Sequence, residues 1–181
     1  MLGAGSRGCG GGRGAGPTMT CVDEVRGLRR LDQAQLDDWR LFLRAHAFVI
    51  SRLEADLAAD GQPSLATYDV LVQLIEAPEH RLRMTELAQA VLLSRSGLTR
   101  LVDRMAALGY VRREPSPGDA RGVHAVLTEE GVSALRRAAR THLRGIGEHV
   151  VDKLTVPELA ALGQVCAKLV PEESGQATSQ V

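Results

Sequence analysis

A change of sequence period near the middle of the chain constrains its fold most. Residues 110–114 and 123–128 alternate apolar and polar side chains as short strands do, and Pro115 to Asp119, between them, are turn-forming residues. Before and after this segment, apolar positions recur every three or four residues, which is typical of helices with one buried face. Two strands alone are only marginally stable, so the predicted hairpin must rest on helices or on a ligand.

The helices can be placed from their apolar stripes and their end signals. Ser64 and Ser94 can each cap a helix, Pro78 can stop one, and Gly109 can take the left-handed conformation that ends another. The expected helices before the first strand are 36–61, 64–77, 85–92 and 94–108. After the hairpin we expect helices 129–154 and 155–169, the second of which opens with the capping box of Thr155 and Glu158.

Composition supports a mainly helical, single-domain protein. The chain is 44% hydrophobic, which is enough to close a core, but only 3% aromatic. The core must therefore be built mostly from Leu, Val and Ala, which suit packed helices better than a sheet sandwich. No segment approaches the roughly 20 apolar residues that cross a bilayer, and the N-terminus lacks the apolar region of a signal peptide. We expect a cytoplasmic protein without a membrane partner.

Both ends of the chain are expected to be loose. Residues 1–31 form a Gly-rich tail and linker that can bury little, and residues 171–181 are mostly polar. Gly3, Gly5 and Gly8 spell the G-x-G-x-x-G of dinucleotide-binding proteins. No strand precedes them and no helix follows, so disorder is favoured over a dinucleotide site.

Residues 84–103 carry the pattern of a helix-turn-helix. Ala88 supplies the small residue where two such helices touch. The apolar positions that would lock the helices together are Leu87, Val91, Leu93, Leu98 and Leu101. The residues left exposed on the second helix are Arg95, Ser96, Thr99, Arg100 and, one turn further, Arg104. Arginine pairs with guanine edges or phosphate, and hydroxyls serve either, so this helix fits a recognition helix for double-stranded DNA.

Positive charge gathers around this helix although the formal net charge of the chain is zero. Residues 94–121 hold six arginines against three acidic residues, six minus three giving +3. A neutral protein with one basic face suits sequence-selective DNA binding. A solvated helix with surface arginines is the alternative for any one of these residues.

A hairpin that follows a recognition helix can act as a wing beside the minor groove. Narrow minor grooves attract arginine, so Arg121, expected at the tip of the hairpin, is the candidate probe. Asp119 would accept hydrogen bonds that set the turn or hold an arginine, or it is a plain turn residue.

Two stretches resemble the MarR family of winged helix-turn-helix transcription regulators. LSRSGLTRLVDRMAALGYVRREPS (93–116) is similar to the recognition helix and first wing strand of that family, and GDARGVHAVLTEEG (118–131) resembles its Asp-x-Arg wing followed by Leu-Thr-x-x-Gly. The resemblance covers about residues 36–169. It implies that Ser94, Ser96, Thr99 and Arg100 face DNA, that Asp119 and Arg121 form the wing tip, and that the first and last helices intertwine into a homodimer.

The expected fold is therefore a mainly α winged helix-turn-helix with long N- and C-terminal dimerisation helices and a two-stranded β-wing. Its parts are an N-terminal dimerisation helix (32–62), a DNA-binding lobe (63–128) and C-terminal dimerisation helices (129–170). The long stripes also favour a dimer on physical grounds, because they offer more apolar surface than a small lobe can cover. A closed monomeric bundle is the alternative.

The expected function is a ligand-responsive repressor that binds a near-palindromic operator, with half-sites about 34 to 36 Å apart or a multiple of this distance. The alternative is a winged-helix module that binds a protein partner and lacks DNA affinity. Family resemblance implies a small aromatic or phenolic effector between the dimer helices and the lobe. Trp39, His46, Tyr68 and Asp69 could line its site, although core packing is the alternative for each.

No sequence feature predicts an enzyme, a cofactor or a metal. Familiar catalytic motifs are missing, so an enzyme would need an unfamiliar site. His142 and His149 share a helix face, but zinc wants three or four ligands, and solvated histidines are favoured. Cys9, Cys21 and Cys166 form no C-x-x-C pair, which favours idle thiols over a disulfide framework or a redox sensor.

Overall fold

The computed structural model describes residues 30–91, 94–116 and 119–170, with the backbone alone for Arg95 and residues 119–121. The chain divides into two units between Phe42 and Leu43, inside the first helix. The expected loose tails fall almost wholly outside the described residues. None of the described helices has the length and apolarity needed to cross a bilayer.

The N-terminal unit contains the first turns of helix α1 (Gln33–Ala59). The N–H of Gln35 donates to Asp32 Oδ1 (2.8 Å), which satisfies one of the free donors at the start of the helix. The rings of Trp39 and Phe42 stack with their centroids 5.8 Å apart, and both side chains are exposed.

The second unit holds the rest of α1 and all the other elements. Its helices are α2 (Leu65–Glu76), α3 (Met84–Ala90), α4 (Arg95–Ala107), α5 (Glu129–His149) and α6 (Val156–Leu169), with short 3-10 turns at Pro78–His80 and Val151–Lys153. The strands are β1 (Arg81–Arg83), β2 (Val111–Ser116) and β3 (Asp119–Leu127). This mainly helical fold with one small sheet confirms the expected fold class.

The predicted end signals of the helices are confirmed. Ser64 Oγ accepts a hydrogen bond from the N–H of Thr67 (3.3 Å), and Ser94 Oγ accepts one from Gly97 (3.2 Å). Gly109 follows α4 with φ of +76°, a conformation that glycine adopts at little cost. Thr155 and Glu158 form the expected capping box, with the Thr155 N–H donating to Glu158 Oε2 (2.8 Å).

The sheet has three strands, so the prediction of four helices before any strand is wrong. The antiparallel order is β1-β3-β2, and β1 pairs Arg81 with Val126 and Arg83 with His124. Three residues are too few to show an alternating pattern, and β1 is a strand only because β3 supplies partners for its backbone. The extra strand anchors the hairpin to the helical part of the lobe.

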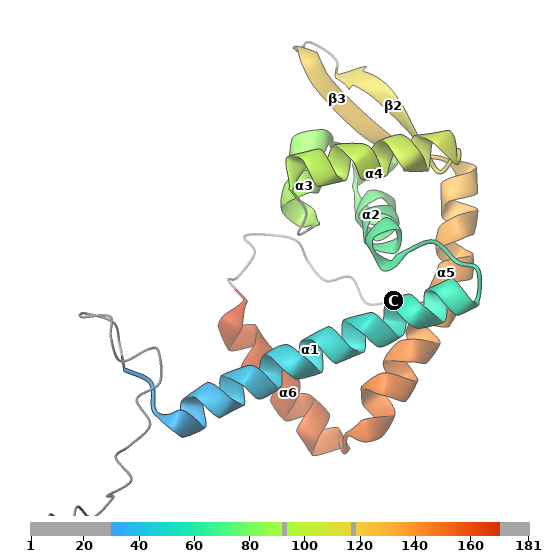
Figure 1. Cartoon of the computed structure of the whole chain (residues 1–181). Coiled ribbons are helices and arrows are strands. Elements are labelled where there is room, and N and C mark those ends of the chain that lie inside the picture. The colour runs from blue at the N-terminus through green and yellow to red at the C-terminus, as the bar shows by residue number, and fades with distance from the viewer. Residues whose placement is uncertain (1–29, 92–93, 117–118, 171–181) are drawn as a thin grey trace, which may run out of the picture. The chain divides into compact units, whose positions relative to one another are not determined.

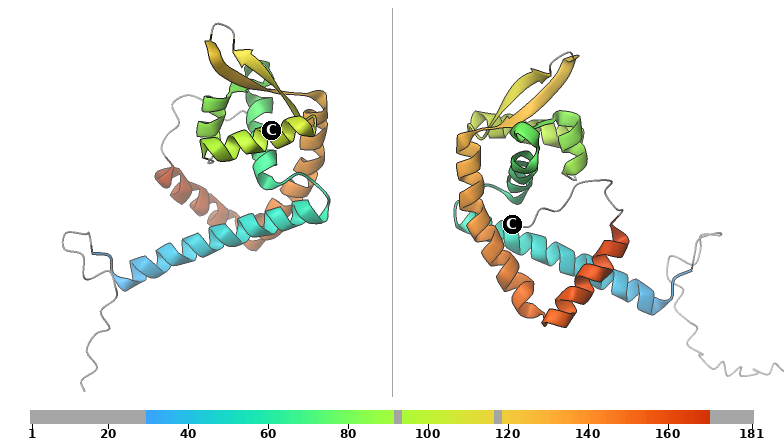
Figure 2. Two further views of the ribbon diagram at one scale, coloured as in Figure 1. Left: turned by 45° about the horizontal axis from the view of Figure 1, so that its top comes forward. Right: turned by 180° about the vertical axis from the view of Figure 1, so that it is seen from behind.

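The hairpin strands extend further than predicted. Pro115 pairs with Val123, and Ser116 pairs with Asp119, so residues expected in the turn belong to strands. Proline is tolerated because β2 lies at the edge of the sheet, where no neighbour needs its missing N–H. The hairpin projects beyond the helices in both views of Figure 2. Its connection, residues 117–118, lies outside the described residues.

The core of the lobe lies between the helices and the sheet. In Figure 1, α2, α3 and α4 are grouped beside the base of the hairpin, and α5 leaves from the end of β3. The fully buried residues of this core are Val70, Leu71, Leu74, Leu87, Val102 and Ala125, together with Ala134 on α5. As the composition predicted, it contains no buried aromatic side chain within the described residues.

Helix α5 packs most closely through small residues. Of its larger apolar side chains, Val132, Leu135 and Ile146 are partly buried against the core, whereas Leu143 is 63% exposed. The buried positions are Gly131, Ala134, Ala138, Thr141 and Gly145. A Cβ added at Gly145 would lie 2.8 Å from Leu53 Cδ2, which shows how closely α5 approaches the C-terminal part of α1. The predicted end at residue 154 is wrong, because glycines at 145 and 147 weaken the last turns and α5 stops at His149.

Candidate nucleic-acid interface

Helix α4 is held by its inner face and presents its outer face to solvent. Leu98, Leu101, Val102 and Met105 are buried against the lobe. Together with buried Leu87 and Val91 of the preceding helix segment, they confirm the helix-turn-helix packing expected from the sequence. Ala88 packs against the same core, whereas Leu93 lies outside the described residues.

The predicted contact residues of α4 whose side chains the structure describes lie on this outer face. Ser94, Ser96, Thr99, Arg100 and Arg104 are all exposed. Ser94 Oγ is committed to the helix cap and lies 3.4 Å from Ser96 Oγ, so Ser94 has a structural role at the start of the helix. Gly97 lies in the first turn of α4, and its N–H is the donor to Ser94 Oγ. The side chain of Arg95 is not described.

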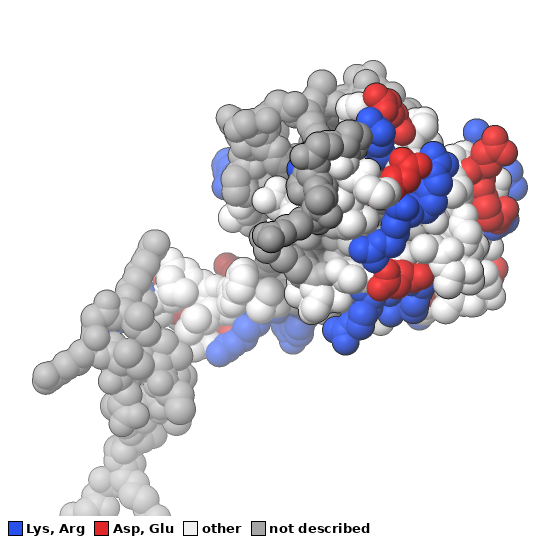
Figure 3. All heavy atoms as spheres, turned by 90° about the horizontal axis from the view of Figure 1, so that it is seen from above, with Lys and Arg blue, Asp and Glu red and all other residues white. Residues whose placement is uncertain are grey.

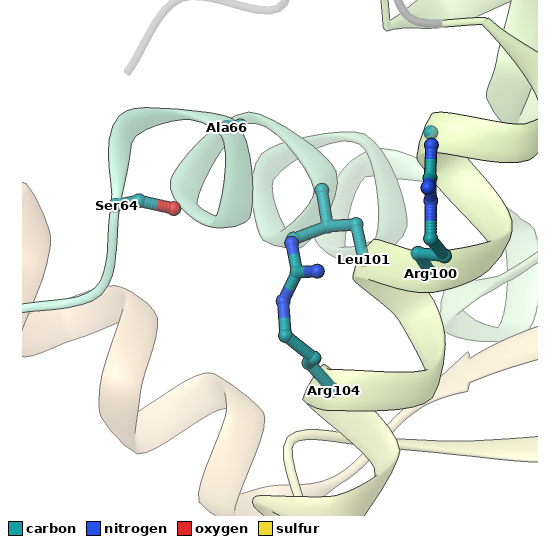
Figure 4. Close-up of a pocket in the computed structure, with 6 residues that line it drawn as sticks. Ser64, Ala66, Arg100, Leu101 and Arg104 are labelled. Atoms are coloured by element: carbon teal, nitrogen blue, oxygen red, sulfur yellow. The ribbon is translucent and has the colours of Figure 1, made fainter.

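Arg100 and Arg104 are available for a ligand. No carboxylate pairs with either guanidinium within the described part of the chain. They line a hollow of about 410 Å³ between α4 and the start of α2, with Ser64, Ala66, Gly97 and Leu101 as its other lining residues. Figure 4 shows the side chains of Arg100 and Arg104 extending from α4 in roughly the same direction, with the Arg104 guanidinium nearer to Ser64.

Two other arginines counted in the basic cluster are paired with acids. Arg112 Nε lies 2.6 Å from Glu114 Oε1 on β2, and this hydrogen bond is the main reason that the pKa of Glu114 is lowered. Arg113 of β2 pairs with Asp103 of α4, which ties the strand to the helix. Lys and Arg side chains in Figure 3 alternate with acidic ones, so this face is mixed in charge. Both of these acids were already subtracted in the predicted excess of +3, so the pairing leaves that excess unchanged and assigns it to the other arginines of residues 94–121.

Arg121 lies close to the connected end of the hairpin, but inside a strand rather than in the turn. The backbone of both Asp119 and Arg121 belongs to β3. Pro115 pairs with Val123, and the next residue, Ser116, pairs with Asp119. The three residues of β3 between these two partners, Arg121 among them, therefore form an irregularity in the register. Such bulges re-aim side chains near functional sites. The Asp-x-Arg spacing indicated a turn but could not reveal this bulge.

A second cluster contains two of the residues predicted for an effector site. The Tyr68 ring lies against the His142 ring, with centroids 4.4 Å apart. Partial burial raises the pKa of the neighbouring Asp69 carboxyl, and the positive charge that His142 can carry opposes this shift. His46 is exposed on α1, and Trp39 belongs to the N-terminal unit. The described structure thus brings Tyr68 and Asp69 beside a histidine that the prediction left out of this site.

The sequence favoured solvated histidines on α5, and this interpretation is wrong. His142 Nδ1 is buried and has no hydrogen-bond partner among the described residues. His149 Nε2 lies 2.6 Å from Asp56 Oδ2, and the side chain of His149 is only 13% exposed. Their spacing correctly indicated a shared side of the helix, but only the packing of α1 and α2 against α5 determines their partners. In the described residues, no three His, Cys, Asp or Glu side chains gather as a metal would require.

Protonation of His142 is expected to destabilise the fold. Burial lowers the pKa of His142 below its usual value of 6.5, with Asp69 acting in the opposite direction. Below that value the unfolded chain takes up a proton that the folded protein resists, so the free energy of unfolding should fall as the pH drops. Urea denaturation between about pH 5 and 7.5 should show this fall in the wild type and a flatter profile in His142→Gln. Parallel profiles would contradict the assignment.

A family model described as "MarR family" matches residues 62–122, the stretch from the start of α2 into β3. The chain resembles Sco3205, a MarR family transcriptional regulator from Streptomyces coelicolor whose structure was solved in complex with DNA. The two are 36% identical with a TM-score of 0.73, over 80% of this chain and 91% of the other.

Two further similarities agree with this one. AbsC, a MarR family transcriptional regulator from Streptomyces coelicolor, is 33% identical with a TM-score of 0.71, over 78% of this chain and 95% of the other. The multiple antibiotic resistance protein MarR of Salmonella typhimurium is 29% identical over 86 residues, which are 48% of this chain. The matched region spans 60% of the length of that relative.

Proposed function

The chain belongs to the MarR family of winged helix-turn-helix regulators, and we propose that it is a transcriptional regulator that binds double-stranded DNA in a sequence-specific manner. The observation that carries this proposal is helix α4. Its apolar face is buried, its start is capped by Ser94, and its exposed face offers Arg100 and Arg104 without acidic partners in the described chain. A rigid helix with free guanidinium groups suits the major groove.

The β2–β3 hairpin supplies the second contact in this proposal. With α4 in the major groove, the projecting hairpin would reach the adjacent minor groove, where arginine is favoured electrostatically. Arg121 is the proposed probe and Asp119 the residue that orients it. The bulge that contains Arg121 supports this role, because an irregular strand can direct a side chain out of the regular alternation.

We propose that the protein acts as a homodimer on a near-palindromic operator. Helix α6 has no buried residue, and Leu159, Leu162, Val165 and Leu169 on it are at least 36% exposed. In the N-terminal unit, Trp39, Leu41 and Phe42 are exposed as well. Apolar surface on this scale marks an interface, and symmetric pairing of identical chains is the usual way to cover it. A dimer would present two copies of α4 to half-sites about 34 to 36 Å apart.

We propose further that a small aromatic or phenolic ligand releases the protein from DNA, which makes it a repressor. The supporting observation is the cluster of Tyr68, Asp69 and His142 between α2 and α5, with one ring nitrogen left without a partner among the described residues. Because α2 belongs to the core under α4, a ligand that moves α2 against α5 would shift the recognition helix. Trp39 and His46 remain effector candidates on the grounds of the sequence alone.

Selection from a random duplex library tests DNA binding directly. The wild-type protein should enrich a site with two inverted half-sites, and its affinity for that site should fall steeply with salt, by about 0.9 in log affinity per log salt for each phosphate contacted. Mixed-sequence DNA serves as the control for non-specific binding. A flat salt dependence without enrichment would instead indicate a winged-helix module that binds a protein partner.

Arg121→Ala is expected to weaken binding to the selected site by about 1 to 3 kcal/mol, because it would remove the minor-groove contact while leaving α4 in place. Fluorescence anisotropy gives the affinity, and thermal unfolding checks that the fold is intact. Arg140→Ala is the matched control, since Arg140 is an exposed arginine on α5 with no acidic partner in the described chain. Equal affinities of the Arg121 and Arg140 variants would remove the hairpin from the mechanism.

A further inference from the structure

A second hollow lies between helix α5 and the turn that joins α1 to α2. It has a volume of about 360 Å³, and its lining residues are Asp60, Gln62, Arg137, Arg140, Thr141 and Arg144. All six belong to the second unit of the chain, and all six carry polar or charged side chains. Small-molecule sites usually have mostly apolar walls. This lining therefore fits a polar ligand, unlike the aromatic effector proposed for the cluster around Tyr68.

Arg140 is surrounded by like charges on its own helix. Residues three or four positions apart are neighbours on a helix surface, and those of Arg140 are Arg136, Arg137, Leu143 and Arg144. None of these four is acidic, and Arg140 makes no hydrogen bond or ion pair within the described chain. Like charges at this spacing destabilise a helix. An anion bound at Arg140 would relieve this repulsion.

The two arginines that flank Arg140 in the hollow are partly neutralised. Arg137 Nη2 donates to Glu130 Oε1 (3.2 Å), and Arg144 Nε lies 4.0 Å from Glu148 Oε1. These acids leave the charge of Arg140 without a counterpart in the described chain. A guanidinium group has five N–H donors, so the flanking arginines also keep donors for a ligand. Phosphoryl oxygens accept such hydrogen bonds in pairs, which makes arginine a common phosphate ligand.

Asp60 is the acidic residue of the lining, and α5 fixes its position. Its Oδ2 accepts hydrogen bonds from the Thr141 hydroxyl (2.7 Å) and from Arg144 Nη2 (2.8 Å). These bonds, that of Thr141 first, lower the pKa of the Asp60 carboxyl, which therefore stays ionised at neutral pH. The other oxygen, Oδ1, has no hydrogen-bond partner among the described residues. Such an oxygen repels a phosphoryl group but accepts a hydrogen bond from a hydroxyl group.

The α1–α2 turn adds a neutral group beside Asp60. Gly61 has φ of +64°, and the N–H of Gln62 donates to the Leu57 carbonyl (2.8 Å), so the turn has the bonding of a Schellman motif. Gln62 Nε2 donates to the Asp60 carbonyl (2.9 Å). The second N–H and the Oε1 of this amide have no partner in the described part of the chain. The amide can therefore donate to a ligand hydroxyl and accept from another.

We propose that this hollow binds a sugar phosphate or a similar polyhydroxylated phosphate ester. The phosphoryl group lies at Arg140 and Arg137, and the hydroxyl groups bond Asp60 and Gln62. A phosphate monoester carries about −1.5 to −2 charges at pH 7, which suits a row of guanidinium groups. A hydroxyl group suits the carboxylate and the amide, because it both donates and accepts. The site lies on α5 and the α1–α2 turn, so it is separate from the DNA contacts proposed for α4 and the hairpin.

Isothermal titration calorimetry of the full chain tests this site at constant ionic strength in phosphate-free buffer. The probes are glucose 6-phosphate, inorganic phosphate and glucose. The wild type should bind glucose 6-phosphate more tightly than phosphate and should not bind glucose. Arg140→Gln should weaken binding of glucose 6-phosphate about tenfold or more, because charged hydrogen bonds are lost. Gln62→Ala should weaken binding of glucose 6-phosphate but not of phosphate.

Arg52→Gln is the matched control, since Arg52 is an exposed arginine in the α1 part of the second unit and lies outside the lining of the hollow. It should bind glucose 6-phosphate as the wild type does. Thermal unfolding gives a second measurement, because a ligand that binds the folded state raises Tm. Glucose 6-phosphate should raise the Tm of the wild type and of Arg52→Gln, but not that of Arg140→Gln. Without ligand, Arg140→Gln should unfold at the same or a higher temperature, since it removes like-charge neighbours.

Three results would overturn this proposal. The wild type binds no glucose 6-phosphate, or Arg140→Gln and Arg52→Gln bind it equally. Phosphate binds as tightly as glucose 6-phosphate, which would indicate a site for the free anion. In ligand-free buffer Arg140→Gln binds the selected duplex more weakly than the wild type, which would assign the groove to DNA. Calorimetry requires no DNA, so failure of the proposed regulator function would leave this test intact.

Discussion

Arg100→Ala is expected to remove most of the site-specific affinity, by about 1 to 3 kcal/mol per half-site and roughly twice that for a symmetric pair of half-sites. Arg100 lies on the exposed face of α4 and has no acidic partner among the described residues. Its guanidinium is therefore already free to form the bidentate contact that arginine makes with guanine. No existing ion pair has to break first, so the full contact energy is available to binding.

Binding to the selected duplex and to mixed-sequence DNA should be measured side by side at one salt concentration. The loss should be large for the selected site and small for mixed DNA, because a base contact contributes to discrimination and a phosphate contact contributes to both. Arg140→Ala should leave both affinities close to those of the wild type. An equal loss on both duplexes would show that Arg100 contacts only the backbone.

Gly131→Ala is expected to destabilise the protein by about 1 to 3 kcal/mol or more. Gly131 lies in the first turn of α5, where an added Cβ would collide with the carbonyl oxygen of Tyr110 and lie 2.7 Å from Leu127 Cδ1. The same carbonyl accepts a hydrogen bond from the N–H of Thr128 (3.1 Å) and lies 2.9 Å from its hydroxyl. Displacing it would disturb the point where β2, β3 and α5 meet.

Gly147→Ala in the same helix is the matched control. A Cβ there meets no atom within 4 Å, so alanine should stabilise the helix by about 0.5 to 1 kcal/mol. Chemical denaturation at one protein concentration should give changes of opposite sign for the two variants. Equal changes would show that Gly131 acts through helix propensity and that the contact with Tyr110 is unimportant.

The elements with strong local signals were predictable from the sequence. Helix starts at Ser64, Ser94 and Thr155 depend on a side chain that bonds its own helix within three residues, so local sequence contains all the needed information. The inner face of α4 was likewise predictable, because large apolar residues at helical spacing have one way to be buried.

Elements defined by distant partners were not predictable. Strand β1 exists because β3 pairs with it, and the bulge beside Arg121 results from the register of two strands. The small buried residues of α5 were not predicted, because small residues pack tightly only where another helix approaches closely. Helix α1 does so at Gly145, through Leu53. The partners of His142 and His149 depend on α2 and α1 in the same way.

By itself the sequence determined the mainly helical class, the helix-turn-helix and which residues α4 would expose, since each follows from short-range hydrogen bonds and the burial of a periodic stripe. Tertiary structure alone decided which charges remain available. It pairs Arg112 and Arg113 with acids and leaves Arg100 and Arg104 unpaired within the described chain, beside the hollow at the start of α2. The physical reason is that an ion pair depends on distances of a few ångströms between side chains of different elements, and a count of charges along the chain does not contain those distances.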